Sequence, residues 1–307
     1  MNGVVVGVNE TAEAREALDW ALAEANSRGV PLTAVLAWSE SKVGSSQGAN
    51  AEVERRKDIL FEVLDAASRR VGSTVPMEAL VVPGSAREAL LGAADTADML
   101  VLGRRRMGKL GRLVLGSVSG EVLERATIPV TVMRHAGDTA ALASTGTHIA
   151  SVDATEPLRP MDVIGALNPR VVVGVDSSRA SIEALKHAGE VATRLGAVLE
   201  AVYAWQISTL APLPGSWGWS PPIEEYQNFA TKALGEAIEE ANLGLPSEQF
   251  IATIVHKAPA AALVDASATA ARVVVGARGL GGFDRLLLGS VSRQVVDYAQ
   301  CPVTVVR

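Results

Sequence analysis

Residues 273–290 read VVVGARGLGGFDRLLLGS, in which three valines precede the spaced pattern G-x2-G-x9-G-S. The spaced residues are Gly276, Gly279, Gly289 and Ser290. A strand that opens into a glycine loop and then into the start of a helix can hold a phosphate, because backbone N–H groups approach the anion closely. The stretch therefore predicts a strand, a phosphate-binding loop and a helix, in that order.

A degenerate copy of this pattern lies earlier in the chain, at residues 100–117 (LVLGRRRMGKLGRLVLGS). It keeps Gly103, Gly116 and Ser117, but Arg106 stands where the second glycine belongs. Residues 113–134 also align with residues 286–307 without a gap. An internal repeat of this length indicates that the protein consists of two related halves.

Each half alternates short β-rich runs with segments of helical periodicity. Helical spacing places Ala14, Ala17, Leu18, Ala21, Leu22 and Ala25 on one face, and Ile182, Leu185, Ala188, Ala192 and Leu195 on another. Continuous apolar runs suit strands that are buried on both faces of a parallel sheet. We therefore predict two tandem Rossmann-like, doubly wound α/β domains, each with a five-stranded parallel sheet flanked by helices. The expected strands lie near 3–8, 32–38, 77–82, 98–103 and 129–134, and near 170–175, 197–205, 249–256, 271–276 and 302–307.

Composition separates the two halves and marks one insertion. Residues 1–134 and 170–307 are the expected domains, and residues 135–169, which have small polar composition, are the expected linker. Residues 206–222 are rich in proline and tryptophan. They are interpreted either as a lid over the site or as an ordinary surface loop.

The overall composition excludes several classes of protein. The 307 residues suffice for two domains, and a net charge of −6 argues against general attraction to nucleic acid or to an anionic membrane. The single cysteine, Cys301, rules out an internal disulfide and reads as an inert core thiol. No membrane-spanning run and no signal peptide are apparent, so the cytoplasm is the expected location.

Three segments of the second half should converge at the carboxyl end of its sheet, where ligands bind in this kind of fold. They are the end of the first strand with Asp176, the end of the second strand around Ala204, and the glycine loop. Asp176 can accept hydrogen bonds from ribose hydroxyls or help to hold a metal ion. The alternative is structural, with glycines making turns, Ser290 capping a helix, and Asp176 capping a helix or starting a turn.

The repeated glycine pattern, with the opening run 172–176 (VVGVD) and the terminal run 301–307 (CPVTVVR), resembles the universal stress protein family in its tandem, ATP-binding form. The resemblance covers nearly the whole chain apart from the linker. It implies binding of ATP, usually with Mg2+, and a homodimer in which the last strands, 129–134 and 302–307, pair within the chain.

The same resemblance assigns roles to residues of the second half. Asp176 and Gly276 would contact ribose, the backbone near Ala204 would meet adenine, and Asp176 is the candidate metal ligand. The phosphates would be held by Gly279, Gly289, Ser290 and Val291, with Ser292 in support. Through the repeat, the corresponding positions of the first half are Asn9, Ala37, Gly103, Gly116, Ser117, Val118 and Ser119.

The first half departs from this pattern at two positions. Arg106 replaces a glycine and can either obstruct the backbone or grip a phosphate, and Asn9 replaces the aspartate without contributing charge to a metal. Binding there is expected to be weaker, altered or absent. Residues 103–110 almost form a P-loop, but Leu110 lacks the hydroxyl that such a loop places on Mg2+. The basic residues of this stretch either bind phosphates or form a charged loop exposed to solvent.

The sequence favours an ATP-binding regulator or sensor of the stress response that hydrolyses ATP slowly or not at all, since no dedicated general base is evident. One alternative is an enzyme that transfers adenylyl groups or hydrolyses ATP. Another is a scaffold for protein interactions that binds no nucleotide. None of the four histidines forms a pair at metal-ligand spacing.

Overall fold

The computed structural model describes residues 3–9, 11–38, 46–104, 115–134, 169–206, 222–280 and 288–307, and side chains of helix α2 from residue 50 onward. The chain divides into two units, Met1–Ala136 and Gly137–Arg307, and each is described by itself. Three sequence predictions fall on residues that lie largely outside this description. They are the linker 135–169 apart from residue 169, the lid or surface loop 206–222 apart from its two end residues, and the basic stretch 105–114 with Arg106.

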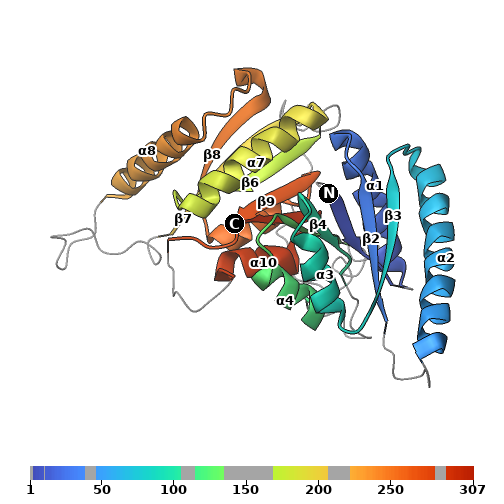
Figure 1. Cartoon of the computed structure of the whole chain (residues 1–307). Coiled ribbons are helices and arrows are strands. Elements are labelled where there is room, and N and C mark those ends of the chain that lie inside the picture. Colours follow the sequence, from blue (N-terminus) through green and yellow to red (C-terminus); the bar gives the residue numbers. More distant parts are fainter. Residues whose placement is uncertain are drawn as a thin grey trace, which may run out of the picture. The chain divides into compact units, whose positions relative to one another are not determined.

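The first unit contains a parallel sheet in the strand order β3-β2-β1-β4-β5, with helices between successive strands (Figure 1). The order reverses between β1 and β4, and in such sheets the ligand crevice lies at that reversal. The elements are β1 (Val4–Gly7), α1 (Ala12–Arg28), β2 (Leu32–Trp38), α2 (Ser46–Val71), β3 (Met77–Pro83), α3 (Ala86–Ala94), β4 (Met99–Leu102), α4 (Ser117–Arg125) and β5 (Val130–Val132).

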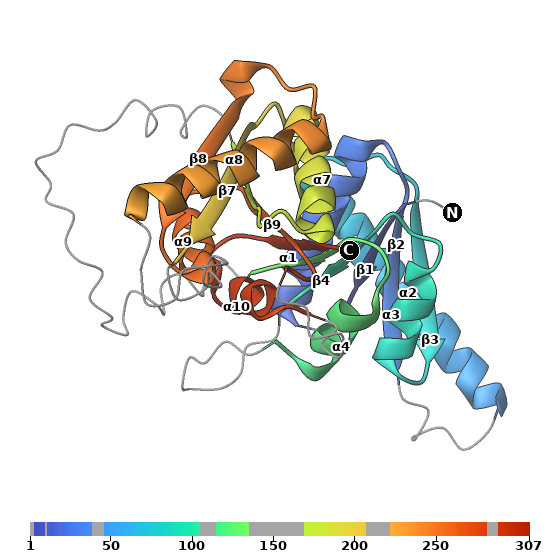
Figure 2. The same ribbon diagram turned by 90° about the vertical axis from the view of Figure 1, so that its left-hand side faces the viewer.

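The second unit repeats this topology with the order β10-β9-β6-β7-β8, so its reversal lies between β6 and β9. Figure 2 shows its helices α7, α8, α9 and α10 around the strands. The α/β class, the tandem arrangement and the parallel strands are confirmed. The elements are β6 (Arg170–Gly174), α7 (Arg179–Leu195), β7 (Val198–Trp205), α8 (Ile223–Ala241), a 3-10 turn (Ser247–Gln249), β8 (Phe250–His256), α9 (Pro259–Ala266), β9 (Arg272–Gly276), α10 (Ser290–Tyr298) and β10 (Val303–Val306).

Apolar helix faces cover each sheet as the periodicity predicts. All six predicted residues of α1 are buried, and in α7 Ile182, Leu185, Ala188 and Ala192 are buried. Leu195 is the exception, since it lies in the last turn of α7 and remains 38% exposed. Both helices end at a glycine with positive φ, Gly29 and Gly196, a conformation that costs glycine little.

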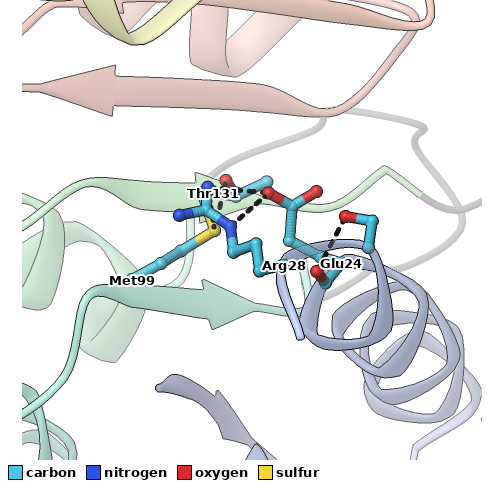
Figure 3. Close-up of polar contacts among 5 residues, drawn as sticks. Glu24, Arg28, Met99 and Thr131 are labelled. Atoms are coloured by element: carbon cyan, nitrogen blue, oxygen red, sulfur yellow. Dashed lines mark hydrogen bonds and ion pairs between the residues drawn. The ribbon is translucent and has the colours of Figure 1, made fainter. Parts of the chain in front are cut away.

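A buried carboxylate in α1 is a feature that periodicity did not predict. Glu24 is 4% exposed, and its Oε1 accepts a hydrogen bond of 2.7 Å from Nε of Arg28 (Figure 3). The Arg28 guanidinium also lies 3.8 Å from the sulfur of Met99 on β4, and the Thr131 hydroxyl on β5 lies 4.0 Å from the same sulfur. This group of polar contacts links the end of α1 to two strands of the first unit.

Candidate functional site

Asp176 follows strand β6 and starts a tight turn of the backbone. Its Oδ1 accepts a hydrogen bond of 3.0 Å from the backbone N–H of Ser178, and Ser177 between them has φ 64°. The alternative reading, that Asp176 starts a turn, is therefore confirmed. It does not cap the helix, because Ser178 is the N-cap of α7 and its hydroxyl accepts from the Ser181 N–H at 3.2 Å.

Asp176 also holds the glycine loop that follows β9. Its Oδ2 accepts a hydrogen bond of 3.2 Å from the backbone N–H of Leu280, and the Ser178 hydroxyl donates to the carbonyl of Arg278 at 3.3 Å. The loop from residue 281 to residue 287 lies outside the described residues. The two carboxylate oxygens thus join the first strand end to the first part of the loop.

Close packing of the protein itself explains two of the loop glycines. A Cβ on Gly276 would lie 2.7 Å from the carbonyl carbon of Ala180, in the first turn of α7, so this position needs glycine to bring the strand end against the helix backbone. A Cβ on Gly279 would lie 2.1 Å from Oδ2 of Asp176. A larger residue there would require the Asp176 carboxylate to turn away from the loop.

Gly289 differs from these two glycines. It is the N-cap of α10 with φ −68°, a conformation open to any residue, and a Cβ there would meet the Ala277 carbonyl at 3.4 Å. Its own N–H is already used, since it donates to that carbonyl at 2.8 Å. The prediction that Ser290 caps this helix is wrong, because Ser290 is the first helical residue and Gly289 occupies the cap.

The first turn of α10 presents three backbone amides. The first backbone bond along this helix is donated by Arg293 to Gly289, and within the described residues the N–H groups of Ser290, Val291 and Ser292 have no partner. Four such amides are free at the start of any α-helix. The Ser292 side chain is 5% exposed, and its hydroxyl donates to the Gly276 carbonyl at 2.6 Å, which fixes the helix start against the end of β9.

Ala204 occupies the same sheet edge, one strand further along. It pairs with Val255 near the end of β7, and the register of Gly174 with Val202 places it level with Asp176. The next residue, Trp205, stacks on His256 with ring centroids 4.3 Å apart and on Tyr226 at 5.8 Å. A recess of 330 Å3 beside Trp205 and His256 opens toward the start of α8.

Negative charge at Asp176 affects a neighbouring group. Burial raises the pKa of Tyr203 above its usual value of 10.0, and the Asp176 carboxylate raises it further. Among the described residues, no group of three or more His, Cys, Asp or Glu side chains could hold a metal ion.

The corresponding residues of the first unit are only partly brought together. Asn9 is exposed, and its Oδ1 accepts hydrogen bonds from the N–H of Thr11 at 2.9 Å and from the Thr11 hydroxyl at 2.6 Å. A Cβ on Gly103 would lie 2.9 Å from the Glu13 carbonyl oxygen, so this glycine packs against α1 as Gly276 packs against α7. Ala37 pairs with Val82 near the end of β2.

Helix α4 of the first unit begins as α10 does. Gly116 is its N-cap, and Ser117, Val118 and Ser119 form its first turn. Within the described residues, the Ser119 hydroxyl makes no hydrogen bond equivalent to that of Ser292. The helix start is therefore retained in the first unit, while the contact that fixes it to the preceding strand is found only in the second.

The sequence interpretation missed Ser178 and Ser181, although their spacing before the apolar face of α7 is an N-cap signal. It also missed the Leu280 amide, which no side-chain pattern reveals. The contact of Ser178 with Arg278 spans 100 residues of sequence. Only the folded sheet brings these groups together.

The model of the universal stress protein family matches residues 1–134 and 168–307. The chain belongs to the universal stress protein family. A universal stress protein of Mycolicibacterium smegmatis is 32% identical over 319 residues, covering 99% of this chain and 97% of that protein. A universal stress protein of Mycobacterium tuberculosis is 31% identical over 315 residues, covering 100% and 97%.

A solved structure of the same family has the same fold. The crystal structure of a universal stress protein from Archaeoglobus fulgidus has a TM-score of 0.66 and 19% identity, covering 99% of this chain and 98% of that one. The family model matches two segments, so the chain has tandem universal stress protein domains. In the described residues, no helix is both long enough and apolar enough to cross a membrane.

Proposed function

We propose that this universal stress protein binds ATP at the carboxyl end of the second unit's sheet. The observation that carries the proposal is the first turn of α10, where the amides of Ser290, Val291 and Ser292 have no partner among the described residues. Ser292 fixes this turn to the end of β9, and Asp176 accepts from Leu280 in the loop that follows the same strand. Amides at a helix start attract phosphate through hydrogen bonds and through the positive end of the helix dipole. The nine residues of α10 are enough to carry such a dipole.

In this proposal the phosphates lie against the first turn of α10 and the loop at Gly279 and Gly289. Ser290 is exposed and can add its hydroxyl, whereas the buried Ser292 hydroxyl acts by fixing the helix start. The family resemblance assigns the backbone of Gly279 and Gly289 to the phosphates, and the Gly289 N–H already donates to the Ala277 carbonyl. The phosphate oxygens would then bind amides that have no partner in the part of the chain that the structure describes.

The remaining groups follow the family resemblance. Ribose would lie at Asp176 and Gly276, and adenine near the backbone of Ala204. Each Asp176 oxygen accepts one backbone N–H and keeps a further lone pair for a ribose hydroxyl or for Mg2+. One carboxylate with phosphates and water is a common Mg2+ environment, so the residues present fit this ion.

We propose a weaker or altered site in the first unit, at Asn9, Ala37, Gly103, Gly116, Ser117, Val118 and Ser119. The amide side chain of Asn9 can hydrogen-bond ribose but brings no charge to Mg2+. Its oxygen already accepts two hydrogen bonds from Thr11. The first unit is therefore expected to contribute less affinity for ATP, or none.

The biological role that fits such a site is regulation of the stress response in the cytoplasm. Bound ATP would favour one conformation or one partner surface through its differential affinity for the two states. Hydrolysis is expected to be slow. The homodimer and the pairing of the last strands within the chain stay predictions, which sedimentation and cross-linking would measure.

Gly289→Val tests the proposal, because the backbone angle at Gly289 is open to valine and a Cβ there meets its nearest neighbour at 3.4 Å. Circular dichroism of the variant checks that the helix start tolerates valine at the N-cap. Gly116→Val is the matched control in the first unit. Equilibrium dialysis of each full-length variant with labelled ATP should show retention lost in Gly289→Val and kept in Gly116→Val. Equal retention by the wild type and Gly289→Val would contradict the proposed site.

A further inference from the structure

A recess of 610 Å3 lies in the first unit between α3 and the outer strands of the sheet, on the face opposite α1 and α2. Val5 of β1 faces this recess, while its neighbours Val4 and Val6 pack in the core with α1 and α2. The volume falls within the range of small-molecule sites, about 300–1,000 Å3. Its polar lining comes mainly from Thr33, Glu78, Ser85, Glu88 and Thr96.

The second unit fills the same place with an arginine. Nη1 of Arg170 donates to Oε2 of Glu200 at 2.7 Å, and Nη2 donates to the Ala266 carbonyl at 3.2 Å and to the Thr269 hydroxyl. Glu200 is 6% exposed, and its other oxygen accepts from the Thr253 hydroxyl at 2.8 Å. A guanidinium group is thus held by a carboxylate, a carbonyl and a hydroxyl.

The strand registers show which residues of the first unit occupy these positions. Val4 pairs with Leu32 as Val171 pairs with Leu199, so Gly3 corresponds to Arg170 and Thr33 to Glu200. The Asp98 N–H donates to the Gly3 carbonyl at 2.9 Å, just as the Ala271 N–H donates to that of Arg170 at 2.8 Å. By this register, Ala93 corresponds to Ala266 and Thr96 to Thr269.

The first unit therefore keeps the two residues whose counterparts accept from the guanidinium, Ala93 and Thr96, and lacks the arginine. Both residues line the recess. No residue with a side chain fits at position 3 without a shift of the backbone, because a Cβ on Gly3 would lie 2.6 Å from the Pro31 carbonyl oxygen. The recess therefore stays open beside the Ala93 carbonyl and the Thr96 hydroxyl.

The first unit has Thr33 at the position of Glu200, and two other glutamates bring negative charge to the recess. Glu78 stands on β3 and Glu88 in the first turn of α3, and both line the recess. Glu88 lies 3.4 Å from Arg87, whose guanidinium also contacts Glu121. Within the described residues the exposed Glu78 carboxylate forms no ion pair, so it can approach a cation that enters from solvent.

We infer that this recess binds a small molecule carrying an alkylguanidinium group. The guanidinium would take the place that Arg170 occupies in the second unit, donating to the Ala93 carbonyl and the Thr96 hydroxyl. Its charge would be balanced by Glu78. The alkyl part would lie along Leu80 and Val82, which line the same recess from β3. Planar guanidinium donors match such a fork of acceptors better than an ammonium does.

Butylguanidinium tests this inference, with butylurea as a neutral probe of similar shape. Titration of the full-length, 15N-labelled protein should shift amide signals of β3 and α3 with butylguanidinium and leave them unmoved with butylurea. Glu78→Gln and Thr96→Val should each weaken binding by about 10-fold, because each removes a hydrogen bond or a charge partner from the cation. Thr269→Val, the matched change in the second unit, should leave the affinity unchanged.

Several outcomes would overturn the inference. These are equal binding of the two probes, an affinity unaffected by both variants of the first unit, signal shifts elsewhere in the chain, or the absence of binding. If a peptide containing arginine shifts the same signals while butylguanidinium does not, the site recognises protein and the small-molecule assignment is wrong. Circular dichroism of each variant verifies that loss of binding is not loss of folding.

Discussion

The two units share one topology but differ in their polar contacts at two equivalent places. One is the carboxyl edge of the sheet, and the other is the sheet face beneath α9 or α3. In the second unit, Asp176 and Ser178 fix the glycine loop, and Arg170 with Glu200 fills the space beneath α9. In the first, the hydrogen bonds of the Asn9 side chain within the described residues come from Thr11, and the corresponding space is open. A repeated fold thus keeps its backbone while a few polar residues decide which sites are closed by the protein itself.

Loss of the Arg170 charge should give the largest change in stability. We expect Arg170→Gln to lower the free energy of unfolding by about 2–3 kcal/mol, because it leaves the buried Glu200 carboxylate without its cation. Urea denaturation measures this value. The double variant Arg170→Gln with Glu200→Gln should lose less than the sum of the single changes. Additive losses would show that the pair is not coupled.

Close packing at the two strand-end glycines should give a similar cost in both units. Gly276→Ala and Gly103→Ala should each destabilise the protein by about 1–3 kcal/mol, since both place a Cβ within 2.9 Å of a helix backbone. Gly235→Ala in α8 is the control, because its Cβ meets nothing within 4 Å. That change should stabilise slightly. The midpoint of thermal unfolding measures these changes. Equal midpoints for the three variants would show that close packing at Gly276 and Gly103 does not require glycine.

Asp176→Asn and Asn9→Asp, made one at a time, distinguish the proposed nucleotide site of the second unit from that of the first. Asp176→Asn should cost about 1 kcal/mol of stability, because an amide NH2 in place of Oδ2 cannot accept the Leu280 N–H. It should also weaken ATP binding in dialysis. Asn9→Asp should leave stability nearly unchanged, since an aspartate oxygen can still accept from Thr11. A drop in ATP binding with Asn9→Asp alone would assign the nucleotide to the first unit.

The smallest expected effect is a change of stability at high pH, caused by ionisation of Tyr203 in the second unit. Tyr203 has a raised pKa and Leu36 stands at its position in the first unit. Tyr203 therefore contributes stability that is fully present below pH 10 and is lost as the pH rises toward its folded-state pKa. Ultraviolet titration should show this late step disappear in Tyr203→Phe. In Asp176→Asn the step should move to lower pH, and an unmoved step would mean that the carboxylate is not coupled to the ring.

The architecture was predictable because it depends on local patterns. Continuous valine runs such as 171–173 identified buried parallel strands, and the buried faces of α1 and α7 followed from helical spacing. The repeat predicted that both units would have the same topology. The convergence of Asp176 with the glycine loop followed from the rule that strand ends of a parallel sheet meet at one edge.

Contacts between distant residues were not predictable in this way. The burial of Glu24 depends on Arg28 and on strands far along the chain, and the pairing of Arg170 with Glu200 depends on strand register. The structure also changes the reading of Gly276 and Gly279, which pack against α7 and Asp176. The chemistry of a charged side chain allows several partners, and the register of the strands determines which of them lies within reach.

Two α/β halves, each with a glycine-rich helix start, follow from the amino-acid sequence, because hydrophobic periodicity and glycine spacing act over a few residues. Which polar groups meet across the sheet depends on the folded chain. In the fold, the Leu280 N–H donates to Asp176 and Arg170 pairs with Glu200, and the matching recess beneath α3 is open. Hydrogen bonds and ion pairs require atoms to lie within a few ångströms, and the folded backbone sets those distances.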